Sequence, residues 1–143
     1  MAMTDAVGGY GLHVRKPGGY VKDGDAIIVM RDDLDAFLKE LLNPEGFKDY
    51  GPNGLQIEGS DRIARIGFAV SATAHSVSAA VERNAQALIV HHGLFWKFHG
   101  PRTLVGPFAQ RVFPLVRNHI NLFAYHLPLD AHPDVGNAAT LGR

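Results

Sequence analysis

Four consecutive apolar residues at positions 87–90, Ala-Leu-Ile-Val, constrain the fold of this chain more than any other segment. A short apolar run without polar alternation is typical of a strand that is buried on both faces. Residues 63–71 (IARIGFAVS) also have the composition of a buried strand, and residues 73–84 between the two segments have the apolar spacing of a helix. This order predicts a βαβ unit, in which the two strands are parallel and the crossover is right-handed.

The remaining periodicity predicts further helices and strands around this unit. Leu34, Phe37 and Leu38 begin an apolar stripe at helical spacing, and Pro44 ends that helix because proline disfavours the helical conformation of the residue before it. Further predicted elements are a strand at 55–58, a helix at 106–117 that Pro114 kinks or breaks, a strand at 121–126 and a helix after Gly136. We therefore expect an α/β fold: a mixed or parallel sheet with flanking helices.

The first 29 residues differ from the rest of the chain, because they are rich in glycine and have little periodic apolar pattern before residue 26. We expect residues 1–29 to be a poorly ordered leader or a segment introduced by cloning, with an N-terminal hairpin as the alternative. Residues 30–143 then form one α/β domain. The chain has no secretory signal pattern, no apolar run of bilayer length and no cysteine, which together favour the cytoplasm.

Composition excludes several classes of function. Without cysteine there can be no disulfide, thiolate zinc site, iron–sulfur cluster or cysteine nucleophile. Fourteen basic residues balance fourteen acidic ones, which argues against nucleic acid or an anionic membrane as the main partner. No phosphate-loop or serine-hydrolase motif is present. Phe95, Trp96 and Phe98 could stack on a planar ligand, although such a cluster more often serves packing.

Histidine is the unusual residue of this sequence, with eight copies, six of which lie between His91 and His132. His91 and His92 directly follow the apolar run at 87–90, and ligands of open α/β sheets bind at the carboxyl ends of parallel strands. Neighbouring side chains of a strand point to opposite faces. One site can therefore use both histidines only if the chain turns at Gly93 or if the site holds two metals. The alternative is two ordinary loop histidines.

A second group, His126, Asp130 and His132, follows the predicted strand at 121–126. It reaches the same sheet edge as His91 if the strands at 87–90 and 121–126 are parallel. Imidazole and carboxylate together suit zinc, iron, manganese or cobalt better than calcium. His132 could be a ligand, a supporting group or a solvent-exposed residue. Taken alone, this segment could equally be a surface loop.

Three segments closely resemble motifs of the NGG-one-interacting-factor-three family, also called GTP cyclohydrolase I type 2 homologues or dinuclear-metal-centre hexameric proteins. They are residues 53–59 (NGLQIEG), residues 91–97 (HHGLFWK) and residues 121–133 (NLFAYHLPLDAHP). Their order and spacing are similar to those of the family, and the resemblance covers residues 31–143. Ala138 departs from the pattern, since a second asparagine is expected there.

The resemblance implies an α/β fold, a toroidal homo-hexamer and two divalent metal ions in each subunit. His91, His92 and Asp130 match metal ligands of the family. The family's remaining ligands, a histidine and a glutamate, belong to a C-terminal motif that this sequence does not contain. We therefore expect the chain to be the N-terminal part of a larger fold, with an incomplete metal site and no activity of its own.

The expected function is that of a divalent-metal-binding protein with metal-dependent hydrolase chemistry, similar to that of GTP cyclohydrolase homologues. The expected substrate is a small molecule of the nucleotide class, with neither membrane nor nucleic acid as partner. His126 is the candidate for general acid–base work or for supporting a ligand, because the unperturbed pKa of histidine lies near neutrality. The alternative is a non-catalytic metal-binding scaffold or regulatory interaction protein.

Overall fold

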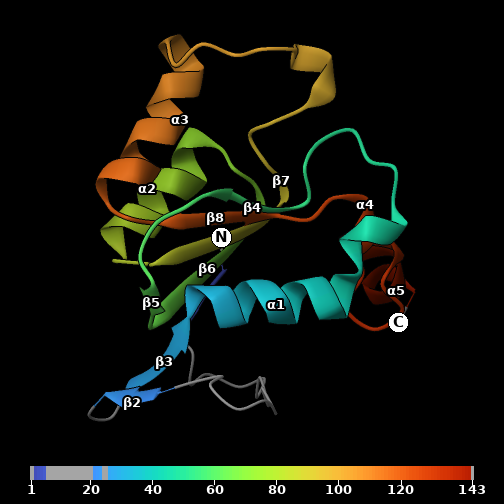
Figure 1. The fold of residues 1–143 in the computed structure, drawn as a ribbon, viewed down its shortest axis with the longest axis horizontal. Helices are drawn as coiled ribbons and strands as arrows, with labels where there is room; N and C mark the ends of the chain where they lie inside the picture. Colours follow the sequence, from blue (N-terminus) through green and yellow to red (C-terminus); the bar gives the residue numbers. More distant parts are fainter. Residues whose placement is uncertain (1, 6–20, 24–25, 143) are drawn as a thin grey trace.

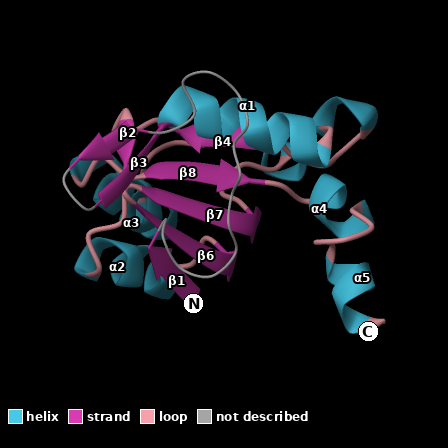
Figure 2. Cartoon of the chain, turned by 90° about the horizontal axis from the view of Figure 1, so that it is seen from below, coloured by secondary structure: helices cyan, strands magenta, loops and turns pink. Residues whose placement is uncertain are grey.

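The structure is a computed structural model that describes residues 2–5, 21–23 and 26–142. A five-stranded mixed sheet lies at its centre (Figure 1). The sheet order is β1 (Ala2–Asp5), β6 (Arg65–Ser71), β7 (Ala87–His92), β8 (Asn121–Ala124) and β4 (Gly54–Ile57). The three central strands are parallel, and their arrowheads point the same way in Figure 2. The two edge strands are antiparallel to their neighbours. The predicted α/β class with a mixed sheet is thereby confirmed.

Helices cover both faces of this sheet (Figure 1). Helix α1 (Arg31–Leu42) lies on one face, and α2 (Ala74–Glu82) and α3 (Gly106–Arg117) lie on the other. Two short helices, α4 (Leu127–Ala131) and α5 (Asn137–Leu141), follow β8. A small second sheet contains β2 (Val21–Asp23), β3 (Ala26–Met30) and β5 (Arg62–Ile63). Within the described residues, no helix is long and apolar enough to cross a membrane.

Strand β7 is the centre of both hydrophobic cores. Leu88 and Val90 pack with residues of α2 and α3, whereas Ala87 and Ile89 belong to the cluster on the α1 side. This alternation is what the continuous apolar run predicts, since each face of a strand takes every second residue. Burial of both faces leaves the carboxyl end of β7 as the place where polar side chains can emerge.

Strand β6 departs from the expectation of a fully buried strand. Phe68 is 39% exposed and Val70 is 71% exposed, whereas Ile66 is buried. Helix α1 packs against β3 and β4, so among the described helices none covers this end of β6 on the α1 side. Apolar side chains left uncovered in this way favour self-association, which we expect for this chain.

Helix α3 has the predicted bounds, and it continues through Pro114 to Arg117. Proline removes one backbone donor, so the carbonyl of Gln110, four residues earlier, loses its helical partner. Gln110 lies on the exposed side of α3, where water can take that place. The predicted helix at 106–117 is therefore confirmed, and of the two effects expected of Pro114, a break is wrong.

The expected leader at residues 1–29 lies largely outside the described residues. Those that are described, 2–5, 21–23 and 26–29, lie in β1, β2 and β3. Ile28 and Val29 of β3 are each 7% exposed, and Val29 packs in the core beside α1. The division of the chain at residue 30 stays a prediction.

A buried asparagine joins the amino ends of the central strands. Asn121 is fully buried at the start of β8, and its side-chain oxygen accepts a hydrogen bond from the Gly59 amide at 2.7 Å. Its side-chain nitrogen donates to the carbonyls of Ser60 at 2.7 Å and Gln86 at 2.9 Å. Every polar atom of this side chain is therefore used, and the loop after β4 is fixed to β8.

We predict that Asn121→Ala lowers the free energy of unfolding by about 3 kcal/mol, because it leaves buried backbone groups without partners. Urea denaturation at neutral pH measures the change. Asn118→Ala is the matched control, since Asn118 is exposed and its side chain donates to the Pro114 carbonyl of its own helix. A loss of similar size in both variants would contradict this account of Asn121.

Candidate metal centre

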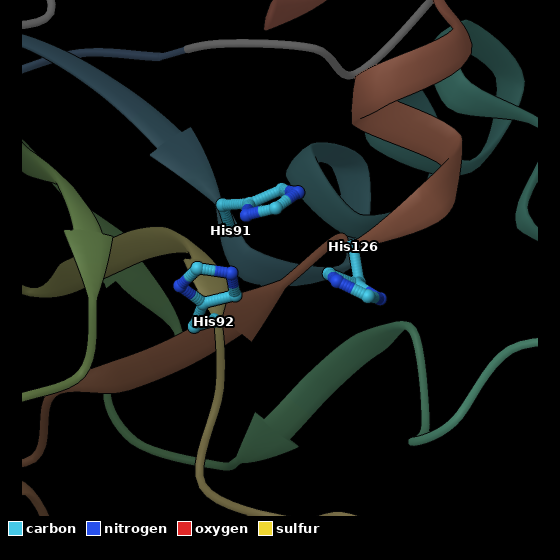
Figure 3. Close-up of side chains that lie close together, drawn as sticks. All are labelled: His91, His92 and His126. Atoms are coloured by element: carbon cyan, nitrogen blue, oxygen red, sulfur yellow. The ribbon is translucent and has the colours of Figure 1, made fainter.

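The parallel register of β7 and β8 places three histidines at one edge of the sheet. Val90 pairs with Ala124, so His92 and His126 each lie two residues beyond this last pair. The ring centroids of His91 and His92 are 4.4 Å apart, and that of His126 lies 4.8 Å from His91 and 5.6 Å from His92. Figure 3 shows the three rings next to one another. The expectation that both groups reach one edge is confirmed.

The three histidines could together hold a metal ion. One ring nitrogen from each lies within 4.8 Å of the others. The Nε2 atom of His91 is buried and has no hydrogen-bond partner among the described residues, although Asp130 Oδ1 lies 3.0 Å from it. A buried nitrogen without a partner is costly, and coordination to a metal would satisfy it. The residues present therefore fit a divalent metal of the class that imidazole prefers.

Asp130 lies at the side of this cluster, in the short helix α4. Its Oδ1 atom is 3.0 Å from His91 Nε2, and it accepts a hydrogen bond from Asn137 Nδ2 at 2.8 Å. Burial alone would raise the pKa of Asp130, but the hydrogen bond from Asn137 and the nearby His91 lower it below the usual value. Asp130 is therefore ionised at neutral pH. The predicted ligand role of His91, His92 and Asp130 stays a prediction.

His132 is not brought to the cluster. Its Nδ1 atom accepts hydrogen bonds from the backbone amides of Asp134 at 3.1 Å and Val135 at 3.2 Å, which stabilise the turn after α4. Among the alternatives left open for His132, this geometry supports a structural role.

His92 is oriented by the neighbouring strand. Ser71 and His92 are paired residues of β6 and β7, and Ser71 Oγ is hydrogen-bonded to His92 Nδ1 at 2.8 Å. Burial lowers the pKa of His92, and the nearby His91 and His126 lower it further. A lowered pKa keeps the imidazole neutral, which is the form that binds metal.

His126 is oriented by a buried carboxylate that the sequence analysis did not identify. The side chain of Asp49 is 2% exposed, and His126 Nδ1 donates to its Oδ1 atom at 2.8 Å. Oδ1 also accepts from the Tyr50 amide, and Oδ2 accepts from Asn53 Nδ2 at 3.0 Å and the Leu127 amide at 2.9 Å. Burial alone would raise the pKa of Asp49, but these hydrogen bonds outweigh it and lower the pKa to about 2.

The hydrogen bond to Asp49 fixes the tautomer of His126. An ionised carboxylate only accepts hydrogen bonds, so His126 Nδ1 carries the proton and Nε2 keeps a free lone pair. Carboxylates hold metal-binding histidines in this way. Asn53 holds the backbone of His126 as well, because its side-chain oxygen accepts a hydrogen bond from the His126 amide at 2.8 Å. Asn53 lies in a motif of the resemblance, but nothing in the sequence connects Asp49 with His126, 77 residues away.

Aromatic side chains line one side of the cluster. Trp96 lies edge-on to His126, with ring centroids 5.1 Å apart, and stacks on Phe98 at 5.7 Å and 17°. Phe98 is 72% exposed, whereas Phe95 packs edge-on against Phe108 of α3. Of the two roles considered for these residues, packing holds for Phe95. Trp96 and Phe98 form an aromatic surface beside the histidines, and ligand stacking there stays a prediction.

Gly93 allows the chain to leave β7 beside the cluster. A side chain at this position would collide with the Gln56 side chain and the Ala124 methyl group. Gln56 Oε1 accepts a hydrogen bond from the Leu94 amide at 2.8 Å, so the loop after Gly93 is held close to β4. Close packing, rather than an unusual backbone angle, therefore requires glycine here.

We predict that Asp49→Asn lowers the free energy of unfolding by about 2 kcal/mol at pH 7, the value that corresponds to its lowered pKa. A carboxylate with a lowered pKa stabilises the fold above its ordinary pKa of 3.8, and this contribution is lost as the pH falls toward 2. The difference between wild type and variant should thus be full at pH 7 and shrink below pH 4. Urea denaturation at both ends of this range measures it.

Glu45→Gln is the control for this experiment, because Glu45 is exposed and should contribute less than about 0.5 kcal/mol. A difference for Asp49→Asn that is independent of pH would show that its carboxylate charge does not stabilise the fold.

Comparison with known proteins identifies the family. The sequence model of Duf34/NIF3 (NGG1p interacting factor 3) matches residues 29–143. A protein of Vibrio cholerae named GTP cyclohydrolase 1 type 2 homolog is 48% identical over 110 residues, which are 77% of this chain and 43% of the relative. A protein of the same name from Neisseria meningitidis is 46% identical over 114 residues, 80% of this chain and 45% of the relative. The chain thus spans less than half the length of these relatives.

Solved structures agree with the sequence comparison. TTHA1606 from Thermus thermophilus matches with a TM-score of 0.76 and 42% identity, over 80% of this chain and 47% of that protein. Reduced HcgD from Methanocaldococcus jannaschii matches with a TM-score of 0.72 and 20% identity, over 82% of this chain and 47% of that protein, and shows the shared fold only. The resemblance seen in the sequence is confirmed, and this chain belongs to the Duf34/NIF3 family.

Proposed function

We propose that this protein binds divalent metal at the three-histidine cluster and is part of a metal-dependent hydrolase that acts on a small nucleotide. The convergence of one ring nitrogen from each of His91, His92 and His126 within 4.8 Å is the observation that supports this most strongly. His92 and His126 each use Nδ1 in a hydrogen bond and so present Nε2 to the same space. Three imidazole groups gathered in this way are an arrangement that suits a divalent metal ion.

In this proposal His91, His92 and Asp130 hold the metal, as the resemblance implies. A divalent metal of this class supplies a Lewis acid that activates water near neutral pH. Ser71 and Asp49 orient the rings of His92 and His126, which prearranges the cluster before a ligand arrives. The aromatic surface of Trp96 and Phe98 limits access of water from one side and offers a planar contact to a substrate base.

His126 has two candidate roles, which metal affinity distinguishes. Its position within reach of the same ion as His91 and His92 supports a role as third imidazole ligand. In the role expected from the sequence, Nε2 instead accepts and returns a proton while Asp49 holds Nδ1–H. A His126→Gln variant that binds metal roughly tenfold more weakly is evidence for the ligand role. Unchanged affinity with lost turnover is evidence for proton transfer.

The names of the curated relatives support the nucleotide class of substrate, since they are called GTP cyclohydrolase 1 type 2 homologs. Because this chain spans less than half of those proteins, a second metal ion, further ligands, the hexamer and the complete active site belong to the proposal as well. A non-catalytic metal-binding scaffold is the alternative.

We predict that the wild-type chain binds zinc or cobalt, and that the double variant His91→Ala/His92→Ala binds it at least roughly tenfold more weakly. Competition with a chromophoric chelator at neutral pH measures the affinity. Affinity should fall as the pH drops through about 6.5, because imidazole must lose its proton to bind metal. His75→Ala is the control, since His75 is exposed on α2. Equal binding by wild type and double variant would refute the assignment.

We further predict metal-dependent hydrolysis of GTP when this chain is fused to the C-terminal half of its Vibrio cholerae relative. Chromatography of the nucleotide products with and without added metal measures the reaction. The same fusion with His91→Ala should show no metal-dependent product. Metal binding without hydrolysis of any nucleotide or phosphoester would favour the non-catalytic scaffold over the enzyme.

A further inference from the structure

A long part of the chain around the histidine cluster contains no acidic residue. Between Glu82 and Asp130 the sequence has no aspartate or glutamate, although the chain as a whole carries equal numbers of acidic and basic residues. Five basic residues lie in this stretch: Arg83, Lys97, Arg102, Arg111 and Arg117. This local excess of positive charge raises the question of which of these side chains could bind an anion.

Two of these arginines meet beside the end of β7. Arg102 Nη1 donates to the carbonyl of Leu94 at 3.1 Å, and Arg111 Nη1 donates to the carbonyl of Ala72 at 3.4 Å. The Ala72 amide itself donates to the carbonyl of His92 at 2.9 Å, and Leu94 follows His92 by two residues. Both guanidinium groups are thus attached to backbone that flanks His92.

The rest of each side chain is also held in place. The Cζ atom of Arg102 lies 3.8 Å from the centroid of the Phe108 ring, and Arg102 Nη1 is 3.2 Å from His99 Nδ1. Arg111 Nε donates to the carbonyl of Pro107, one helical turn earlier in α3, at 3.3 Å. In both side chains Nη2 has no hydrogen-bond partner among the described residues. A guanidinium group has five N–H donors, so each retains donors for a ligand.

Neither Arg102 nor Arg111 forms an ion pair with a carboxylate in the described part of the chain. Both are partly buried, and burial followed by the charge of Arg102 lowers the pKa of Arg111. Arg31 shows the contrasting arrangement, because carboxylates of Asp32, Glu58 and Asp61 surround it at 2.7–3.3 Å. Two neighbouring cations without a counter-charge are unfavourable, and a bound anion would offset the repulsion.

We propose that Arg102 and Arg111 bind the phosphate group of a small phosphate ester whose reacting part extends to the histidine cluster. Planar guanidinium groups match phosphate oxygens with paired hydrogen bonds, and both groups are already positioned by backbone carbonyls. The link to the cluster rests on the proposed function. The phosphate site itself requires only the two arginines, so it can be tested without metal.

Calorimetric titration of the metal-free chain tests this site, with inorganic phosphate and guanosine 5′-monophosphate as the two probes. We expect one phosphate site per chain, and Arg102→Gln and Arg111→Gln should each weaken binding of both probes by roughly tenfold or more. Arg111→Lys should recover part of the affinity, because it keeps the charge but loses the planar fork. Tighter binding of the nucleotide than of phosphate would assign the site to an ester rather than to free phosphate.

Arg117→Gln is the matched control, since Arg117 ends the same helix, is exposed, and lies 5.6 Å from the centroid of the Phe113 ring. Circular dichroism shows that each variant is folded. Absence of phosphate binding by the wild type, or an equal loss in Arg117→Gln, would overturn the proposal. His91→Ala/His92→Ala should bind phosphate within about twofold of wild type in the absence of metal. If the proposed metal site proved wrong, the measured phosphate binding would therefore stay the same.

Discussion

Parallel pairing of β7 with β8 is the constraint on which the histidine cluster depends. The register aligns Val90 with Ala124, so the chain leaves both strands at the same level of the sheet. His91, His92 and His126 follow directly, and none needs a long loop to reach the others. A shift of one residue would turn alternate side chains of β8 to the other face and would bury a polar group in one of the two cores. Because hydrophobic burial on both faces fixes the register, the same interactions that stabilise the sheet position the site.

Hydrogen bonds to the histidine rings then fix how the rings of the cluster are oriented. Ser71 and Asp49 each take one ring nitrogen of a histidine and leave the other free. Asp49 is the more constrained of the two, because backbone amides from two loops converge on its oxygens. The Lys97 side chain donates to the backbone carbonyl of Asp49 at 2.7 Å. This hydrogen bond ties the loop that carries Trp96 to the segment that carries Asp49. The site is thus built on rigid strand ends and closed by loops that are fixed to one another.

Much of the fold could be predicted from the sequence, because the decisive signals were local. Apolar runs and helical spacing were enough for β7, α1 and the βαβ unit, and the position of His91 and His126 after two strands was enough to place them at one edge. The exposed face of β6 was not predicted, since it depends on what lies opposite in space. Asp49 was missed for the same reason: its partner is 77 residues away, and a lone aspartate in a turn-rich segment has no distinguishing pattern.

We propose that the register of β7 and β8, together with Asp49, presents imidazole nitrogens at one point where a metal ion binds. Two-dimensional ¹⁵N–¹H spectra of the histidine rings at neutral pH test this most directly, before and after addition of zinc. We expect His126 to carry its proton on Nδ1 in the metal-free protein. We also expect zinc to shift the resonances of the ring nitrogens of His91 and His92. A proton on Nε2 of His126, or unchanged signals of His91 and His92 with zinc bound, would contradict it.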